Sequence, residues 1–219
     1  MGISNLKLSI LIATIGRRND KFLRLIEELA KQTTDQPIEI IVFWNNGEYK
    51  IGEIRQKLLE EARGEYVCFV DDDDWMPSYY VNEILQNLGK DYVGFEVELF
   101  NEDTLMPRAF HSIKYGVWHQ DEGGYYRGVT HLNPIKRDIA LQASFGMFGI
   151  GEDETWARMV TPLVRSENYI NRIMYYYHHD RFDTAFGGDV KPMGIKYSRP
   201  ELHYDNVKYH SESKETGVY

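Results

Sequence analysis

The chain has 219 residues, of which 25 are basic, 34 are acidic and 42% are hydrophobic, giving a formal net charge of −9. This length fits one domain with its own hydrophobic core, and the negative charge argues against a general binder of nucleic acid or anionic membranes. No basic N-terminal stretch precedes a long apolar one, and no apolar run reaches about 18 residues, so we expect neither a signal peptide nor a membrane span. The single cysteine, Cys68, excludes an intramolecular disulfide, and cytoplasm is the expected compartment.

The first part of the chain alternates between two patterns. Residues 8–13 (LSILIA) form a short apolar run typical of a strand buried on both faces of a parallel sheet. Residues 20–31 then place apolar side chains at helical spacing, with charged side chains on the other face. The alternation continues with an expected strand at 38–44, a helix at 51–62 and a strand at 66–70. This order predicts an α/β domain with a mostly parallel, Rossmann-like sheet and flanking helices.

The second part is less regular. Pro77 suits the first turn of a helix, and the apolar residues at 81–88 supply its buried stripe. Three further elements are expected: a strand at 92–100, a helix at about 153–159 and an aromatic strand at 170–177. The stretch between about 101 and 130 gives no clear assignment, although its segment 115–126, rich in Gly and aromatic residues, suits an acceptor site or a lid.

Four consecutive carboxylates, Asp71 to Asp74, directly follow the expected strand at 66–70. In an open α/β sheet, ligands bind beyond the carboxyl ends of the strands, so these carboxylates should meet the strand ends at 13–14 and 44–46 in one crevice. Mg²⁺ and Mn²⁺ prefer oxygen ligands, commonly one or two carboxylates completed by phosphates and water. The alternative is a solvated acidic turn that caps the next helix. The position at a strand end favours the metal.

Four motifs, in this order, resemble the family 2 glycosyltransferases of GT-A fold, which transfer a sugar from a nucleoside diphosphate sugar with inversion. They are SILIATIGRR at 9–18, EIIVFWNNG at 39–47, IGEIRQKLLEEARGEYVCFVDDDDW at 51–75 and FGIGEDETW at 148–156. The resemblance covers residues 6–88 and returns at 131–180. It implies a domain at 1–186, with a nucleotide-sugar half at about 6–100 and an acceptor half at about 101–186. Residues 187–219 are expected to form a tail or an oligomerisation arm, which allows a homo-oligomer.

The first two motifs imply contacts with the nucleotide, and a uridine diphosphate sugar is the donor expected first. Thr14 and Arg17 would approach the base and the diphosphate, the alternative being a surface loop before a helix. Asn45 and Asn46 stand where the family has an acidic residue that holds uracil or ribose, and an amide can also hydrogen-bond a base edge. The alternative for the asparagines is a simple Asn-Gly turn.

The third motif implies the metal site. Arg55 falls on the family's helix arginine, while Asp71 and Asp73 fall on its Asp-x-Asp pair. Asp71 would contact the ribose, and Asp71 and Asp73 would hold an Mn²⁺ or Mg²⁺ ion that bridges both phosphates. Asp72 is kept as a further nucleotide-sugar contact, because the four-residue run allows a register shifted by one. Trp75 would line the acceptor or sugar pocket, the alternative being a core tryptophan.

The fourth motif implies the catalytic base. Inversion needs a carboxylate that removes the proton of the attacking hydroxyl, and Asp153 is predicted to do this while Glu152 binds or orients the acceptor. The alternative for both is a first helical turn in which acidic residues suit the helix dipole. Two further acceptor contacts are predicted, Trp156 within the motif and His131 in the preceding loop HLNPIKRD.

The segment YYYHHD at 175–180 resembles the family's late aromatic strand, after which some members supply a histidine to the metal or diphosphate. His178 is the predicted ligand and His179 its alternate, since adjacent residues on a strand face opposite ways. A structural histidine is the alternative for each.

The resemblance therefore implies a metal-dependent inverting glycosyltransferase that uses a nucleoside diphosphate sugar and a hydroxyl-bearing acceptor. The charge disfavours nucleic acid as that acceptor. Two other functions remain open. A nucleotidyltransferase shares the sheet and the carboxylates, but would ordinarily carry a Gly-rich basic loop after the first strand. A non-catalytic nucleotide- or sugar-binding module could keep the same fold.

Overall fold

A computed structural model of the chain describes residues 6–15, 19–101, 104–146, 149, 151–179 and 207–210. The described strands are β1 (Leu8–Ile15), β2 (Ile38–Asn45), β3 (Tyr66–Phe69), β4 (Tyr92–Asn101), β5 (Thr104–Leu105), β6 (Ala109–His111), β7 (His119–Asp121), β8 (Gly124–Arg127), β9 (Ile135–Lys136), β10 (Glu167–His179) and β11 (Val207–His210). The helices are α1 (Asn19–Thr33), α2 (Ile51–Glu61), α3 (Tyr80–Asn87), α4 (Arg137–Ala140) and α5 (Glu152–Val160), with 3₁₀ turns η2 (Ile113–Tyr115) and η3 (Thr161–Leu163).

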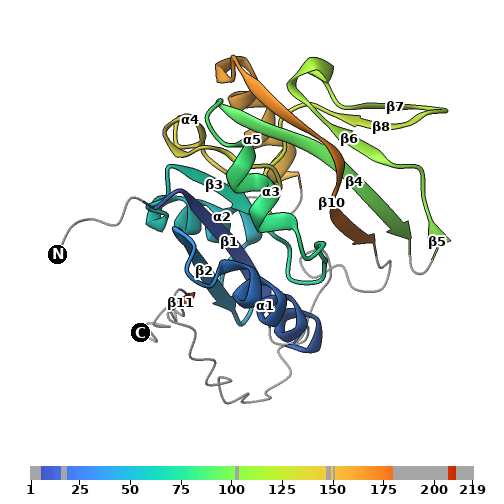
Figure 1. Cartoon of the computed structure of the whole chain (residues 1–219). Coiled ribbons are helices and arrows are strands. Elements are labelled where there is room, and N and C mark those ends of the chain that lie inside the picture. The colour runs from blue at the N-terminus through green and yellow to red at the C-terminus, as the bar shows by residue number, and fades with distance from the viewer. Residues whose placement is uncertain are drawn as a thin grey trace.

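One sheet runs through the whole fold, in the order β11-β2-β1-β3-β9-β4-β6-β8-β7, with β10 and β5 also paired to β4 (Figure 1). Strand β1 pairs in parallel with β2 and β3, which is the arrangement predicted for the first half of the chain. Beyond β3 the sheet becomes mixed, because β9 and β6 run antiparallel to β4 while β10 runs parallel to it. The predicted α/β fold class is confirmed, with a mixed rather than a mostly parallel second half.

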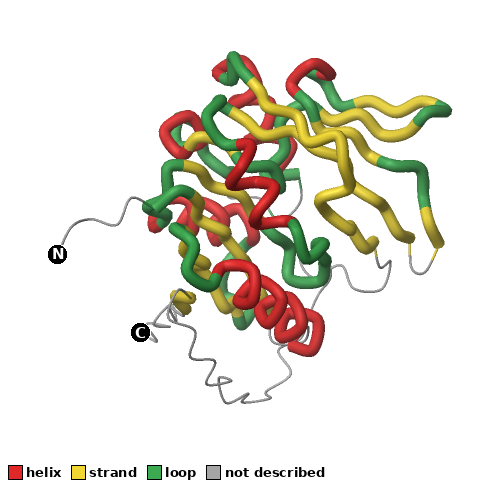
Figure 2. The backbone as a smooth tube through the Cα atoms, in the orientation of Figure 1, coloured by secondary structure: helices red, strands yellow, loops and turns green. Residues whose placement is uncertain are grey.

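Helices cover both faces of the sheet, as the tube view shows (Figure 2). Adjacent residues of β1 show why, since Ile10 belongs to the core beneath α1 and α3, and Leu11 to the core beneath α2 and α5. Alternate side chains of a strand point to opposite faces, so a run that is apolar at every position needs cover on both sides. The apolar run at 8–13 therefore determined the layering of this part of the fold.

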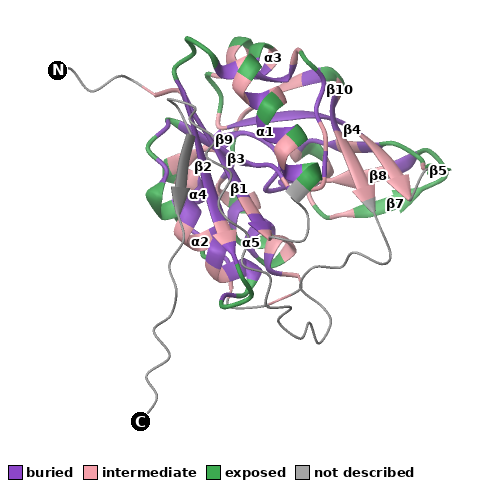
Figure 3. Cartoon of the chain, turned by 90° about the horizontal axis from the view of Figure 1, so that it is seen from below, coloured by how far each residue is buried: buried purple, intermediate pink, exposed green. Residues whose placement is uncertain are grey.

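Burial differs between the two ends of the sheet (Figure 3). The first half of β1, and β3 throughout, are fully buried, whereas β7 is exposed and most of β8 is only partly buried. The end of the sheet made by β8 and β7 is therefore the more open part of the structure.

Some predicted boundaries were wrong. The helix expected to begin at Pro77 begins at Tyr80, because Pro77 lies in a turn in which its carbonyl accepts the backbone N–H of Tyr80 at 3.0 Å. The unassigned stretch from 101 to 130 contains β5 to β8, short strands that are stabilised by pairing with β4 and with one another. Such pairing is long-range and leaves little periodicity in the sequence.

Three further features are the single cysteine, the hydropathy of the helices and the C-terminal segment. Cys68 is fully buried beside Tyr80, and burial raises the pKa of its thiol to about 12, in keeping with a structural thiol. In the described part of the chain, no helix combines the length and the hydropathy that a membrane span requires. Of the segment expected to be a tail or arm, only β11 is described, and it pairs in parallel with β2.

Candidate active site

The carboxyl ends of β1 and β3 meet through a direct hydrogen bond. The backbone N–H of Ile15 donates to Asp72 Oδ2 at 3.2 Å, and Asp72 is buried. Thr14, the preceding residue, is buried, and its hydroxyl has no hydrogen-bond partner among the described residues. Arg17 lies outside the described residues. The carboxyl ends of β1 and β3 are thus in contact, with Thr14 beside them.

The four consecutive aspartates divide into two pairs. Asp72 and Asp74 are each 3% exposed, whereas the side chain of Asp71 is 27% exposed and Asp73 is partly exposed. Asp74 Oδ1 accepts the backbone N–H of His178 at 2.8 Å, which ties the loop to β10. Burial raises the pKa of Asp74 well above its usual value, and the charges of Asp71 and Asp73 raise it further. Asp71 and Asp73 are therefore the members of this run that are open to a ligand.

Arg55 connects the aspartate loop to α5. Its Nη1 lies 2.8 Å from Glu152 Oε1 and its Nη2 lies 3.0 Å from Asp71 Oδ1. Burial would lower the pKa of this guanidinium, but the carboxylates of Asp71 and Glu152 outweigh that effect and raise it. A Cβ on Gly52 of the same helix would overlap the carbonyl oxygen of Gly146, so glycine is what lets α2 approach the segment before α5.

Glu152 and Asp153 are adjacent in the first turn of α5 but differ in environment. Glu152 is 4% exposed and faces Arg55, whereas the side chain of Asp153 is 30% exposed and lines a cavity. Of the two predicted acceptor-side carboxylates, Asp153 is therefore the one that a bound molecule can reach. Glu152 contacts the site through Arg55.

His131 lies between the two acidic motifs. Its Nε2 is 3.8 Å from Asp71 Oδ2 and its Nδ1 is 3.6 Å from Asp153 Oδ2, while the residue itself is 6% exposed. Neither ring nitrogen has a hydrogen bond of ordinary length to another described residue. The backbone carbonyl of His131 accepts the N–H of Phe69 at 2.9 Å, which holds the ring next to the end of β3. His131 thus joins residues that are about eighty positions apart in the sequence.

The two tryptophans predicted to contact the acceptor, Trp156 and Trp75, do not line the cavity. Trp156 is 1% exposed, stacks on Phe145 and donates its indole N–H to the carbonyl of Ala140, so it is a core residue and the prediction of an acceptor contact was wrong. Trp75 is not among the cavity-lining residues, and the guanidinium of Arg24 lies 4.2 Å above its ring.

The two asparagines after β2 have different environments. Asn45 is buried, and its side chain bonds the backbone of Gly47 and Tyr49, which is the turn alternative. Asn46 is exposed, and its backbone N–H donates to Glu48 Oε2 at 3.2 Å. Asn46 is therefore the one whose amide is presented to solvent.

His178 and His179 are the last two residues of β10. His178 stacks on Phe100 with ring centroids 4.9 Å apart, and its backbone N–H is the group that bonds Asp74. The side chain of His179 lies outside the described part of the chain. No three His, Cys, Asp or Glu side chains of the described residues are grouped as a metal site of their own.

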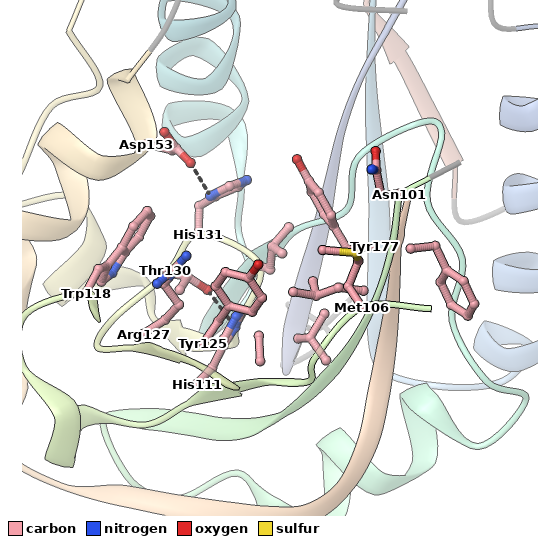
Figure 4. A pocket seen from close by; sticks show the side chains of 15 residues that line it. Asn101, Met106, His111, Trp118, Tyr125, Arg127, Thr130, His131, Asp153 and Tyr177 are labelled. Carbon is pink, nitrogen blue, oxygen red and sulfur yellow. Dashed lines mark hydrogen bonds and ion pairs between the residues drawn. The ribbon is translucent and has the colours of Figure 1, made fainter. Parts of the chain in front are cut away.

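A cavity of about 420 Å³ opens beside Asp153 and His131 (Figure 4). Its lining comes from β4, β6, β8, β10 and the segments between them: Val97, Leu99, Phe100, Asn101, Met106, Ala109, His111, Trp118, Tyr125, Arg127, Thr130, His131, Leu132, Asp153 and Tyr177. His111, Trp118, Arg127 and Thr130 were not predicted individually. Trp118 lies in the aromatic and Gly-rich segment 115–126, whose composition was the signal for this region.

His111 is held as a neutral imidazole. Its Nδ1 lies 2.7 Å from Asn133 Oδ1, and Asn133 donates its amide N–H to the carbonyl of Val93, so the asparagine oxygen accepts and Nδ1 carries the proton. Burial, aided by the charge of Arg127, lowers the pKa of His111 to about 4 and outweighs the hydrogen bond to Asn133. Its Nε2 is left as a hydrogen-bond acceptor in a residue that lines the cavity.

Comparison with known proteins shows which sequences this chain is similar to. Residues 16–122, just under half of the chain, match the model of the family described as Glycosyl transferase family 2. Over 65 residues the chain is 37% identical to the Bacillus subtilis (strain 168) protein named "Putative glycosyltransferase EpsH", a match that covers 30% of this chain and 17% of that protein.

Solved structures of Staphylococcus aureus TarS share the fold. Full TarS superposes with a TM-score of 0.60 and 15% identity, over 79% of this chain and 37% of that one. TarS 1-349 in complex with UDP gives 0.56 and 15%, over 79% and 60% of the two chains. The complex with UDP-GlcNAc gives 0.57 and 14%, over 88% and 62%. The chain thus spans less than two thirds of each of these proteins.

The chain has the GT-A fold that the TarS structures share, and its matched segment is similar to glycosyltransferases. More specifically, the segment 16–122 is of the family 2 type, which confirms the resemblance predicted from the sequence motifs.

Proposed function

We propose that this chain transfers a sugar from a nucleoside diphosphate sugar to an acceptor hydroxyl, with inversion and with the aid of a divalent metal ion. The observation that carries the proposal is the position of His131, within 3.8 Å of Asp71 and 3.6 Å of Asp153. Asp71 and Asp153, the carboxylates proposed for the donor and acceptor sides, lie on either side of this ring. A donor bound at the strand ends would present its sugar to the cavity that Asp153 lines.

The donor class is supported by the fold and by the strand ends. TarS, which shares the fold, has been solved with UDP and with UDP-GlcNAc, so a uridine diphosphate sugar is the first donor to test. In this chain the buried hydroxyl of Thr14 and the exposed amide of Asn46 are the polar groups that β1 and β2 offer to a nucleotide. Asp71 is the carboxylate of the third strand end that can accept from a ribose hydroxyl.

The residues present suit a divalent metal ion. Asp71 and Asp73 are two partly exposed carboxylates whose charges raise the pKa of the buried Asp74 between them and β10. A cation would relieve this repulsion, and hard cations are commonly held by one or two carboxylates together with substrate phosphates. Asp71 and Asp73 would hold Mg²⁺ or Mn²⁺, with His178 as a neighbouring candidate, and the ion would neutralise the charge of the departing diphosphate.

The acceptor side depends on Asp153. Its carboxylate would accept the proton of the attacking hydroxyl as the new glycosidic bond forms, which general-base catalysis requires. His131 contacts this carboxylate and orients it, and Arg55 fixes both acidic motifs by binding Asp71 and Glu152. Because Glu152 is buried against Arg55, its proposed role is to position the loop and not to contact the acceptor.

A screen of nucleotide sugars tests the proposal. Purified protein is incubated with each of several uridine and non-uridine diphosphate sugars and Mn²⁺, and released nucleotide is measured. Slow release of nucleoside diphosphate from one donor, lost on chelation, is the expected result. Release of sugar 1-phosphate, which follows from attack at the α-phosphate, would instead indicate a nucleotidyltransferase. Tight binding of the nucleotide without turnover of any donor, even with mixed glycan acceptors, would indicate a non-catalytic module.

A further inference from the structure

The cavity beside Asp153 is lined by residues from the second half of the sheet. None of its lining residues comes before Val97, so none belongs to β1, β2 or β3, whose ends are the proposed nucleotide site. Its floor is apolar, formed largely by residues of β4 together with Met106, Ala109 and Leu132. A sugar's C–H face or an aglycone suits such a surface, while an isolated charge does not.

One full positive charge lines this apolar cavity. Arg127 at the end of β8 packs its guanidinium 5.1 Å from the ring centre of Trp118 and 5.5 Å from that of Tyr125. Its Nη1 donates to the carbonyl oxygens of His119 and Tyr126, at 3.2 and 3.3 Å. No carboxylate of the described residues forms an ion pair with it, in contrast to Arg55, Arg63, Arg108, Arg158 and Arg172.

The guanidinium of Arg127 therefore retains donors for a bound molecule. An arginine carries five N–H donors, and the two carbonyl bonds of Arg127 both use Nη1. The aromatic rings hold the planar group in place, so that little rotamer freedom is lost when an anion binds. The charge of Glu154 acts on Arg127, but no described carboxylate forms an ion pair with it. A partly buried cation of this kind, next to an apolar surface, is complementary to a carboxylate or a phosphate.

The other polar groups of the cavity fit the same ligand. His111 is neutral, with Nδ1–H engaged by Asn133, so it offers an acceptor to a sugar hydroxyl and not a second charge. Asp153 and His131 border the cavity together, which places the base within reach of a molecule bound there (Figure 4).

We propose that the acceptor is an anionic sugar, whose carboxylate or phosphate pairs with Arg127 while its ring packs on Trp118 and Tyr125. This inference rests on the proposed glycosyl transfer and specifies the acceptor class at the same site. The anion could come from a uronic acid or a sugar phosphate, because both present negatively charged oxygens that a guanidinium binds.

The test compares three probes that differ at one carbon: p-nitrophenyl β-D-glucuronide, p-nitrophenyl β-D-glucoside 6-phosphate and the neutral p-nitrophenyl β-D-glucoside. Binding to the full chain is measured by ligand-observed NMR and by titration, at low and at high salt. We expect the parent protein to bind at least one anionic probe about tenfold more tightly than the neutral one, and salt to reduce the difference. Which anionic probe is preferred tells whether a carboxylate or a phosphate is recognised.

The variants separate Arg127 from general charge. Arg127→Gln should abolish the preference, Arg127→Lys should keep part of it, and Arg165→Gln, at an exposed arginine outside the cavity, should leave it unchanged. Equal binding of all three probes by the parent, or a preference that survives in Arg127→Gln, would overturn the inference. If Arg127→Gln does not fold, the salt dependence and Arg127→Lys decide the question.

Failure of this inference is distinguishable from failure of the proposed function. Uridine diphosphate binding and donor hydrolysis are measured on the same samples, and neither requires the acceptor. Donor hydrolysis without an anionic preference contradicts only the acceptor class. An anionic preference without donor binding or hydrolysis would contradict the proposed glycosyl transfer and leave the cavity as a binding site.

Discussion

Arg55 Nη1 and Glu152 Oε1 lie 2.8 Å apart although 97 residues separate them in the sequence. Both side chains are less than a tenth exposed, and Arg55 also binds Asp71 with its second terminal nitrogen. This buried pair therefore joins the helix of the nucleotide half to the helix that carries Asp153. In a buried position the pair acts through geometry, because the cost of removing two charges from water offsets much of their attraction.

The first prediction concerns stability. Glu152→Gln removes one carboxylate from a buried guanidinium, and breaking a buried pair in this way costs roughly 3 kcal/mol of unfolding free energy. Urea denaturation measures the change. Glu154→Gln is the matched control, because Glu154 is on the same helix in an exposed pair with Arg158 and its loss should cost less than about 0.5 kcal/mol. Equal effects of the two substitutions would mean that Arg55 is satisfied by Asp71 alone.

The second prediction concerns the base. Asp153→Asn keeps the shape of the side chain but removes the proton acceptor, so turnover with a working acceptor should fall roughly 10²- to 10⁴-fold while donor affinity stays close to the parent value. Single-turnover rates and donor titrations measure the two quantities. Near-parental turnover in Asp153→Asn would leave Asp153 as a helix-start residue only.

The third prediction concerns the metal. Binding of uridine diphosphate should require Mg²⁺ or Mn²⁺, and Asp73→Asn should weaken both binding and turnover because it removes a charged ligand. Titration calorimetry with and without metal measures this dependence. Asp121→Asn, at an exposed carboxylate of β7, serves as the control. If the parent protein binds the nucleotide equally well after chelation, the assignment of a metal to Asp71 and Asp73 is wrong.

The fourth prediction concerns pH. The pKa of His111 is lowered from 6.5 to about 4 in the folded protein, so the unfolded state binds more protons between these values. The stability that depends on neutral His111 is fully present above pH 6.5 and is lost as the pH falls toward 4. Denaturant midpoints measured across this window should fall with pH in the parent protein and fall less steeply in His111→Gln.

The exposed His119 provides the control for this experiment. His119→Gln should leave the slope of stability against pH unchanged, since its side chain is exposed on β7. A slope that is the same in His111→Gln as in the parent would show that other groups are responsible for the loss.

The sequence by itself determined the layered part of the fold. The apolar runs of β1, β2 and β3 have side chains on both faces, so helices had to cover both, and the intervening stripes at helical spacing supplied them. Asp71 to Asp74 could be placed at a strand end for the same reason, because strand direction follows from the alternation of strand and helix. These are local patterns, which can be recognised in the sequence without knowing which segments pack against them.

Only the tertiary structure decided which side chains are buried against one another and which are open to a ligand. Asp153 and Glu152 are equivalent in sequence terms, and it is the packing of α5 on α2 that buries Glu152 against Arg55 and leaves Asp153 open. Trp156 and Asn45 were plausible ligand contacts until packing and turn geometry engaged them. Arg127 could not be predicted, because what distinguishes it is that no described carboxylate forms an ion pair with it. Its surroundings are formed by β6, β8 and the loop to α4, which come together through long-range strand pairing.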